Sequence, residues 1–326
     1  MKKNMFRWVT IAVLLSTVVI LSSNLVAAEK KYPSRPITLA CAFPPGGSGD
    51  LLNRIWGKYM EKELGVSVVP DNRPGGGGIV VTSYLSHARP DGYTLGNFGD
   101  FMVTGILLGQ ATYKMEDLHI IAEVARLGCV LAVPSDSPYK TVQDLIKAAK
   151  QTPVKYGHPG IATVIYMRMA AVAKYANLKT TPVPMKGEGE VITALLGKHI
   201  PAGVMSSFAA GPQAEAGRLR ILMSFDEPAA VGLDPSIPDL EAVFGKDAPD
   251  ITVSTYLVAP AKTPKEVIEV LQKTMAKIAK DPAFIAELKR NRVAARYTDG
   301  KTVMEKKIPA KIPVLKEIMK EAGLIK

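Results

Sequence analysis

Two glycine-rich loops carry the residues best suited to chemistry, and that chemistry is the binding of an anion. The first loop reads FPPGGSGD (43–50) and the second reads YGHPGIAT (156–163), and each joins an expected strand to an expected helix. Glycines let a ligand approach the backbone, while the first helical turn presents unpaired N–H groups and a partial positive charge. Two such helix starts facing each other across a cleft would hold one carboxylate. A tight turn without a ligand is the alternative for each loop.

Polar side chains in these loops have two roles open to them. Ser48 can cap its helix or hydrogen-bond a ligand. Asp50 falls in the first helical turn, where a carboxylate favours the helix dipole, so a structural role is the simpler one. A third loop, DNRPGGGG (71–78), holds Arg73, which could bind a second carboxylate or lie solvated.

Familiar catalytic and metal-binding motifs do not occur in the sequence. There is no H-E-x-x-H, C-x-x-C or G-x-S-x-G, and GKT (300–302) lacks the upstream glycine of a phosphate-binding loop. The histidines have no metal-ligand spacing, and only His158 is kept as a candidate, because of its loop. Lysines are spread without interleaved aromatic residues, which argues against nucleic acid as a partner. We therefore expect no metal, no cofactor and no catalytic residue.

The N-terminal segment has the pattern of a secretory signal peptide. A basic stretch (1–8) is followed by an apolar run (9–21), then by small residues and a switch to polar ones. We predict cleavage after Ala28, with Ala27 nearly as good, in the small-residue zone. The apolar run is short for a bilayer span, which needs ~20 residues. A retained N-terminal anchor is the alternative. The mature protein is expected in the periplasm.

Export changes how the composition is interpreted. The formal charge is +11, and removal of 28 residues lowers Lys plus Arg from 41 to 38 against 30 acids, which leaves +8. A net charge of +8 on the mature protein predicts a weak attraction toward small anions and does not indicate a nucleic-acid-binding surface. Two cysteines, Cys41 and Cys129, exclude a disulfide-dense scaffold. Two buried free thiols are the preferred interpretation, and a bond between them in an oxidising compartment is the alternative.

The elements that must position these loops follow from hydrophobic periodicity. Apolar runs predict strands at 35–43, 66–70, 119–134, 199–208, 217–225 and 251–260. Amphipathic stretches predict helices at 51–64, 163–176 and 190–197. This alternation predicts an α/β protein with mainly parallel sheets. A chain of 326 residues suits two domains of ~150 residues, with a cleft between them.

Three further helix starts are marked by capping signals. Thr141 with Asp144 forms a capping box. Thr263 is expected as an N-cap, with Pro264 in the first helical position. The pair Asp281-Pro282 repeats that start signal.

The sequence resembles the extracytoplasmic substrate-binding proteins of tripartite tricarboxylate transporters, the TctC-like or Bug family. The motifs span essentially the whole mature chain in the family's order: KYPSRPITL, FPPGGSGDLLNR, DNRPGGGG, RPDGYTL, KYGHPG, PMKGEGEVITALLG, AGRLRIL and YLVAPAKTP. The resemblance implies an α/β, type II periplasmic-binding-protein architecture, with two lobes and a hinge of two crossover strands. It divides the chain into a signal peptide (1–28), lobe 1 (29–127 with 256–326) and lobe 2 (128–255).

The resemblance also implies a ligand site. The first loop would grip a carboxylate with backbone groups and water, a role that falls on Phe43, Gly46, Gly47, Ser48 and Asp50. The corresponding loop of the second lobe contributes Gly157, His158, Gly160, Ala162 and Thr163. The loop after the GYTL strand contributes Asn97 and Phe98, and Met205 and Ser206 complete the predicted set.

Departures from the family's pattern bear on the ligand. Met205 stands where many members carry an acidic residue, which would suit an amine, and Ala162 replaces a glycine. Methionine offers a polarizable apolar wall instead, and Phe98, Phe101, Tyr166 and Met205 would together line an apolar chamber. The hypothesis is a ligand with one carboxylate and an apolar or aromatic body. Packing of these side chains into the lobe cores is the alternative.

The function implied is capture, not catalysis. A monomeric solute-binding protein would close on a small carboxylate and present it to integral membrane subunits of a transporter. One alternative is a ligand-binding partner of a signalling receptor. The other is an exported cleft hydrolase or isomerase, which would need a paired nucleophile and base.

Overall fold

The computed structural model describes residues 31–249 and 251–326. The predicted signal peptide, residues 1–28, lies outside the described residues. Contacts divide the chain into a short unit, Met1–Ser34, and a large unit, Arg35–Lys326, and all elements below belong to the large one. Within the described residues no helix has both the length and the apolarity needed to cross a membrane.

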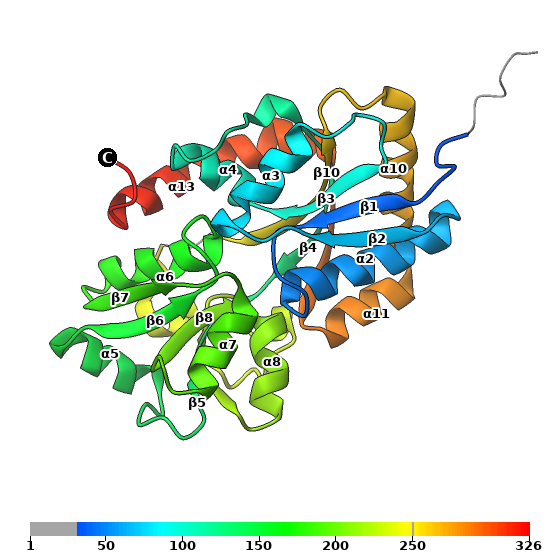
Figure 1. The fold of residues 1–326 in the computed structure, drawn as a ribbon. Coiled ribbons are helices and arrows are strands. Elements are labelled where there is room, and N and C mark those ends of the chain that lie inside the picture. Colours follow the sequence, from blue (N-terminus) through cyan, green and yellow to red (C-terminus); the bar gives the residue numbers. More distant parts are fainter. Residues whose placement is uncertain (1–30, 250) are drawn as a thin grey trace, which may run out of the picture. The chain divides into compact units, whose positions relative to one another are not determined.

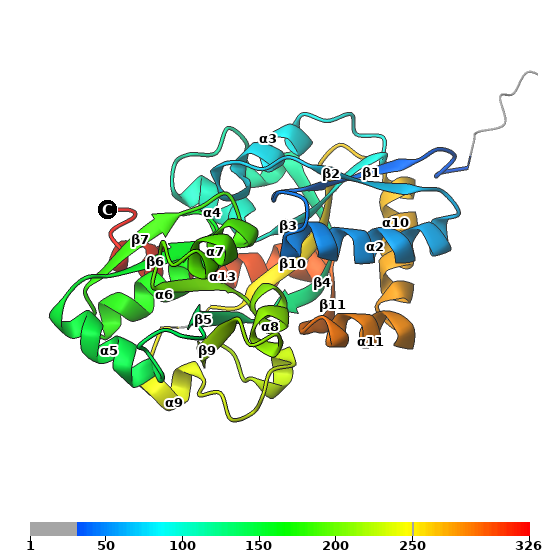
Figure 2. The same ribbon diagram turned by 60° about the horizontal axis from the view of Figure 1, so that its bottom comes forward.

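The first of two sheets has six strands, in the order β11-β4-β10-β3-β1-β2. These strands are β1 (Ile37–Cys41), β2 (Val68–Asn72), β3 (Thr94–Gly99), β4 (Leu118–Leu127), β10 (Val253–Pro260) and β11 (Val293–Asp299). One side of the sheet carries α2 (Ser48–Leu64), α10 (Lys265–Ile278) and α11 (Pro282–Arg290), and the other carries α3 (Ile79–Ser86), α4 (Phe101–Leu107) and α13 (Ile308–Glu321) (Figures 1 and 2). A short turn of helix, α12 (Gly300–Thr302), leads from β11 toward α13.

The second sheet has five strands, in the order β7-β6-β8-β5-β9. They are β5 (Cys129–Pro134), β6 (Val154–His158), β7 (Thr180–Pro184), β8 (Ala202–Ser206) and β9 (Leu219–Ser224). One face packs against α7 (Glu188–Leu196) and α8 (Ser207–Glu215), and the other against α5 (Val142–Gln151) and α6 (Val164–Tyr175). The short α9 (Leu240–Phe244) lies beside β9.

The chain crosses twice between the two sheets. Only Gly128 separates β4 of the first sheet from β5 of the second, and the chain returns after β9 to form β10. This confirms the predicted two-lobed architecture with two crossovers. The lobe limits, 29–127 with 256–326 and 128–255, stay a prediction, and β10 already begins at Val253.

The expectation of mainly parallel sheets was wrong, because both sheets are mixed. Strand β1 pairs in parallel with β2 and β3, and β6 pairs in parallel with β7 and β8. The strands that carry the crossovers run antiparallel to their neighbours: β10 pairs with β3 and β4, and β5 with β8 and β9. One crossover leaves the first sheet and the other enters it, so β4 and β10 lie side by side in opposite directions.

Most predicted elements form where the periodicity placed them. Helix α2 ends at Gly65, which has φ 71° and donates its N–H to Glu61, as a C-terminal glycine should. The capping box of Thr141 and Asp144 is present, and Asp281 caps α11. The predicted N-cap at Thr263 was wrong, because its hydroxyl donates to the Pro260 carbonyl and Pro264 precedes the helix instead.

Two segments differ from their sequence-based expectation. The loop 71–78 contributes its first residues to β2 and its glycines Gly76–Gly78 to a turn of 3₁₀ helix. The run 199–208 divides, because β8 ends at Ser206 and α8 begins at Ser207. Ser206 caps that helix by accepting the Ala209 N–H, so the second serine in the pair starts a helix where an extended strand was expected.

Candidate functional site

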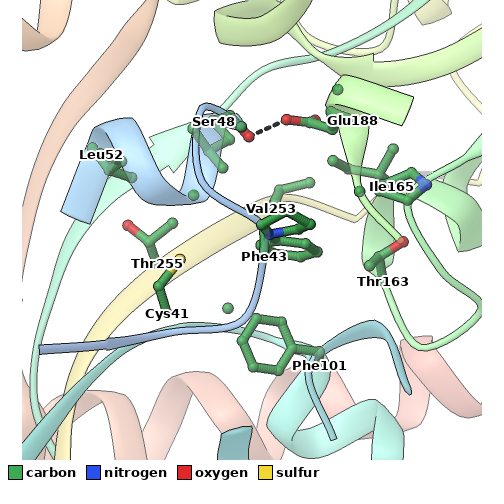
Figure 3. A pocket seen from close by; sticks show the side chains of 18 of the residues that line it. Cys41, Phe43, Ser48, Leu52, Phe101, Thr163, Ile165, Glu188, Val253 and Thr255 are labelled. Atoms are coloured by element: carbon green, nitrogen blue, oxygen red, sulfur yellow. Dashed lines mark hydrogen bonds between the residues drawn. The ribbon is translucent and has the colours of Figure 1, made fainter. Parts of the chain in front are cut away.

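A cavity of about 470 Å³ lies between loops of the two lobes (Figure 3). The first lobe supplies the β1–α2 loop, the end of β3 and the start of β10. The second lobe supplies the starts of α6 and α7. Of the predicted site residues, the cavity is lined by Phe43, Gly46, Gly47, Ser48, Asn97, Phe98 and Thr163.

The cavity wall is largely apolar. Phe43 meets Phe101 edge to face, with ring centroids 6.1 Å apart, and Phe98 lies 5.6 Å from Phe101. Leu52, Leu127, Val164, Ile165 and Val253 extend this surface. An apolar wall of this kind suits the body of a ligand, while orientation has to come from a few polar groups.

Helix starts from both lobes supply polar groups. Helix α2 begins after Gly47 and α6 begins after Thr163, and the first residues of both helices line the cavity. The Thr163 hydroxyl accepts the Tyr166 N–H, which leaves the first N–H groups of α6 without a helical acceptor. These two helix ends present partial positive charge to the same space, which is the arrangement that holds a carboxylate.

Asp50 supports the first loop from below and does not line the cavity. Its carboxylate accepts the Gly46 N–H and the Arg54 Nε–H, both at 3.0 Å. These bonds outweigh burial and hold the pKa of Asp50 below its usual value. Asp50 therefore fixes the conformation of the loop that shapes the cavity. Gly46 has φ 81°, a conformation that suits glycine, and in it the Gly46 N–H points toward the Asp50 carboxylate.

Glu188 is the principal site residue that the sequence did not reveal. It is the first residue of α7, lines the cavity and is 5% exposed. Its carboxylate accepts hydrogen bonds from the Ser206 N–H and hydroxyl and from the Ser48 hydroxyl, which reaches it from the other lobe (Figure 3). The periodicity starts this helix at residue 190, which places Glu188 in the loop before it.

Ser48 thus bonds across the cleft and does not cap its own helix. Helix α2 has no side-chain cap, because its N-cap is Gly47 and Ser48 is already the first helical residue, with its hydroxyl donated to Glu188. Because Ser48 starts a helix of the first lobe and Glu188 a helix of the second, their contact joins the two lobes at one end of the cavity.

Other contacts close the cleft at its opposite rim. The Thr104 hydroxyl of the first lobe donates to the Ala162 carbonyl of the second. Gly160 lies so close to Gly77 that a Cβ on Gly160 would come within 2.8 Å of the Gly77 Cα atom. The lobes therefore touch at two places beside the cavity.

Four of the five predicted residues of the second-lobe loop lie behind the cavity wall, and only Thr163 lines the cavity. His158 is fully buried, stacks on Tyr166 with ring centroids 4.2 Å apart, and accepts the Gly160 N–H through Nδ1. Burial lowers the pKa of His158 to about 4, so the imidazole is neutral. Gly157 faces Met185, Val191 and Ile200 in the core. Gly157, His158, Gly160 and Ala162 do not line the cavity.

The predicted chamber is only partly assembled. Phe98 and Phe101 line the cavity, whereas Tyr166 stacks on His158 and Met205 lies fully buried in the core of the second lobe. Met205 is on β8, the central strand of the sheet, and its side chain packs in the core with Val191 and Leu195 of α7, so it does not line the cavity. Ser206 reaches the site only through its hydrogen bonds to Glu188.

Two further charged residues near the site have their charged groups paired with other residues of the protein. Asp100 lines the cavity, but its carboxylate accepts from Lys311 and the Tyr256 hydroxyl at 2.8 Å and from the Ser254 N–H at 3.0 Å. Arg73 pairs with Asp71 at 2.7 Å and lies over the Tyr84 ring, away from the cavity lining.

The two cysteines are buried free thiols. Cys41 lines the cavity, and burial raises its pKa to about 11. A thiol held neutral in this way is a poor nucleophile and acts as part of the apolar wall.

Two lobes, two crossovers and helix starts from both lobes around one cavity define the class: a solute-binding protein of the periplasmic-binding-protein type. Solved structures with the same fold agree. One is Rpa4515 of R. palustris with adipate, at TM-score 0.84 and 24% identity, covering 90% of this chain and 98% of that chain. Another is the periplasmic binding protein BugD, at TM-score 0.84 and 22% identity, covering 90% of this chain and 100% of that one.

Sequence comparison gives the family. Residues 52–324 match the model of the "Tripartite tricarboxylate transporter family receptor", TctC, and the chain belongs to that family. A curated relative is the UPF0065 protein in the gbd 5' region of Cupriavidus necator, 32% identical over 262 residues, which are 79% of this chain and 79% of the relative.

Proposed function

We propose that the protein captures a small carboxylate with an apolar body between its two lobes. The observation that carries this proposal is the largely apolar cavity onto which the starts of α2 and α6 converge from opposite lobes. Unpaired N–H groups at two helix starts suit one carboxylate, and the phenylalanine wall suits a hydrocarbon chain or ring. The adipate in the structural neighbour Rpa4515 is a dicarboxylate with an apolar chain, which supports a carboxylate ligand with an apolar body but leaves open the group at its far end.

The proposed setting is the periplasm, where the loaded protein would present its ligand to membrane subunits of a tripartite tricarboxylate transporter. Membership of the receptor family supports this role, as does the signal-peptide pattern in residues 1–28. We propose binding and not catalysis because the cavity offers backbone N–H groups and apolar side chains, which bind and orient a ligand. The thiol of Cys41 is buried and neutral, so it is a poor nucleophile.

Thermal unfolding with a panel of acids tests the proposal. A ligand that binds only the native state stabilises it by RT ln(1 + [L]/Kd), about 2.7 kcal/mol at a hundredfold excess over Kd. Monocarboxylic, dicarboxylic, tricarboxylic and aromatic acids are compared by differential scanning fluorimetry, and at least one is expected to raise the melting temperature. The primary amide of the best acid serves as control and should give no rise.

The absence of a shift with every acid would count against the proposal. Uptake of the best acid, radiolabelled, in a strain that lacks the gene then tests the transport role. Normal uptake there, together with strong binding by the purified protein, would favour the alternative of a partner for a signalling receptor.

A further inference from the structure

Glu188 places a buried carboxylate in the cavity with bonding capacity to spare. A carboxylate has about four positions at which it accepts hydrogen bonds. Three of them are occupied: one on Oε1 by the Ser206 N–H, and two on Oε2 by the hydroxyls of Ser206 and Ser48. The remaining position is on Oε1, in a side chain that lines the cavity.

The positive charges near this carboxylate have other positions or partners. Lys186 also lines the cavity, but its side chain is exposed and forms no ion pair with Glu188 among the described residues. Lys311 is bound to Asp100 at 2.8 Å. Arg292 belongs to a smaller cavity of about 220 Å³ that shares Ser48 and Glu188, and it pairs with Glu215. Within residues 31–249 and 251–326, no ion pair to Glu188 forms.

A buried carboxylate without a cation is energetically costly. Burial removes the carboxylate from water, at an effective cost of several kcal/mol for a buried ion. The hydrogen bonds to Glu188 offset only part of that cost. Burial accordingly raises the pKa of Glu188, against the opposing effect of its serine donors. A second carboxylate brought into the same cavity would raise that cost, whereas a donor from the ligand would lower it.

We propose that Glu188 determines the ligand's second functional group: the protein selects a monocarboxylate whose far end carries a hydrogen-bond donor, an ammonium above all, and rejects dicarboxylates. This inference rests on the proposed function. The helix starts hold the carboxylate, the phenylalanines hold the chain, and the free position of Glu188 accepts the donor. The acidic partner for an amine, which the sequence lacks at Met205, is thus supplied by another element.

Matched ligand sets test this selectivity. Hexanoate, adipate and 6-aminohexanoate have the same chain length and differ at one end, and octanoate, suberate and 8-aminooctanoate form a longer set. Binding is measured by isothermal titration calorimetry. A hydrogen bond to a charged group is worth about 1.5–3 kcal/mol, so we expect the amino acid to bind about tenfold to a hundredfold more tightly than the diacid.

Glu188→Gln is the decisive variant. Glutamine keeps an oxygen for the Ser206 N–H, and its amide can donate to the Ser206 and Ser48 hydroxyls, so the fold is retained. The amino acid should lose its advantage, the diacid should gain affinity, and the monoacid should change least. Glu317→Gln removes the same charge at an exposed position of α13 that does not line the cavity, and it should alter the affinities by a small, equal factor.

The outcomes separate this inference from the proposed function. The inference fails if the diacid binds to the wild-type protein as tightly as the amino acid does. It also fails if Glu188→Gln changes the affinities of all the ligands by the same factor. In both cases the proposal of carboxylate capture stands. If no compound in either set binds, and no acid in the wider panel does, both fail.

Discussion

His158 shows how one buried side chain makes stability depend on pH. Its pKa is lowered to about 4 in the folded protein, against about 6.5 for an unperturbed histidine. The unfolded chain therefore takes up a proton first as the pH falls. The stability is fully present above pH ~6.5 and is lost progressively as the pH falls toward ~4.

We expect His158 to lower the free energy of unfolding by about 2 kcal/mol between pH 7 and pH 5. Urea denaturation at the two pH values measures this. His158→Phe keeps the ring stacked on Tyr166 but cannot titrate, so that part of the pH dependence should disappear. His87→Gln, at an exposed histidine, should retain it. An unchanged pH dependence in His158→Phe would show that the imidazole is not the group responsible.

The role of a residue could be predicted from the sequence where its partners are close in the chain. It could not be predicted where the partners are distant. Asp50 acts on Gly46 and Arg54, four residues away on either side, and its structural role follows from the first-turn position. Glu188 is buried by Ser48, which is 140 residues distant in the chain. A glutamate in a glycine-rich loop has no local signal of burial, so only the folded arrangement of both lobes identifies it.

At the scale of elements, the glycine loops of the two lobes meet at a point too close for side chains. Gly160 has φ 124°, and a Cβ there would lie 2.8 Å from the Gly77 Cα atom. Gly160→Ala should therefore hold the loops apart and weaken closure as well as strain its own backbone, which costs about 1–3 kcal/mol. We expect about tenfold weaker binding of the best acid by calorimetry.

Gly217 offers the matched control for this prediction. It also has a positive φ, 66°, but a Cβ there meets no atom within 4 Å. Gly217→Ala should lower the melting temperature through strain while leaving the affinity near the wild-type value. Equal affinities in the two variants would mean that closeness of the loops has no part in binding.

Element positions were largely encoded locally, and strand directions were not. Periodicity and caps placed α2, α5, α6 and α11 because apolar spacing and N-cap chemistry act within a few residues. The mixed character of the sheets depends on β4 pairing with β10, whose partners Leu127 and Val253 lie far apart in sequence. The hydrophobic pattern within one strand does not indicate whether the neighbouring strand runs parallel or antiparallel to it.

For the whole molecule, the contacts between the lobes lead us to expect that separation of the lobes controls ligand entry and release. The cavity is bounded by the contact of Ser48 with Glu188 at one end and by the approach of Gly77 to Ala162 at the rim. Both contacts must break for the cleft to open. A covalent bond across the rim would therefore block exchange without altering the cavity lining, since neither Gly77 nor Ala162 lines it.

The double variant Gly77→Cys, Ala162→Cys provides that bond. A Cβ on Gly77 would lie 3.2 Å from the Ala162 Cβ, slightly closer than the spacing of about 3.5–4.5 Å found in disulfides, so the rim must shift by a few tenths of an ångström. Gly77 also has φ 62°, so a cysteine there strains the backbone, which costs about 1–3 kcal/mol. The natural Cys41 and Cys129 are buried and should not compete. When the protein is loaded and then oxidised, dissociation of the ligand should slow by about tenfold or more, because domain opening gates ligand release.

Stopped-flow or filter-binding measurements before and after reduction check this prediction. A reducing agent should restore faster exchange. Each single-cysteine variant gives the rate that its substitution alone produces, and the oxidised double variant is compared with that rate. When the empty protein is oxidised, association should slow as well, because the closed lobes exclude the ligand from either direction. Rapid binding by the oxidised, empty protein would mean that the ligand reaches the cavity by a path that needs no separation of the lobes.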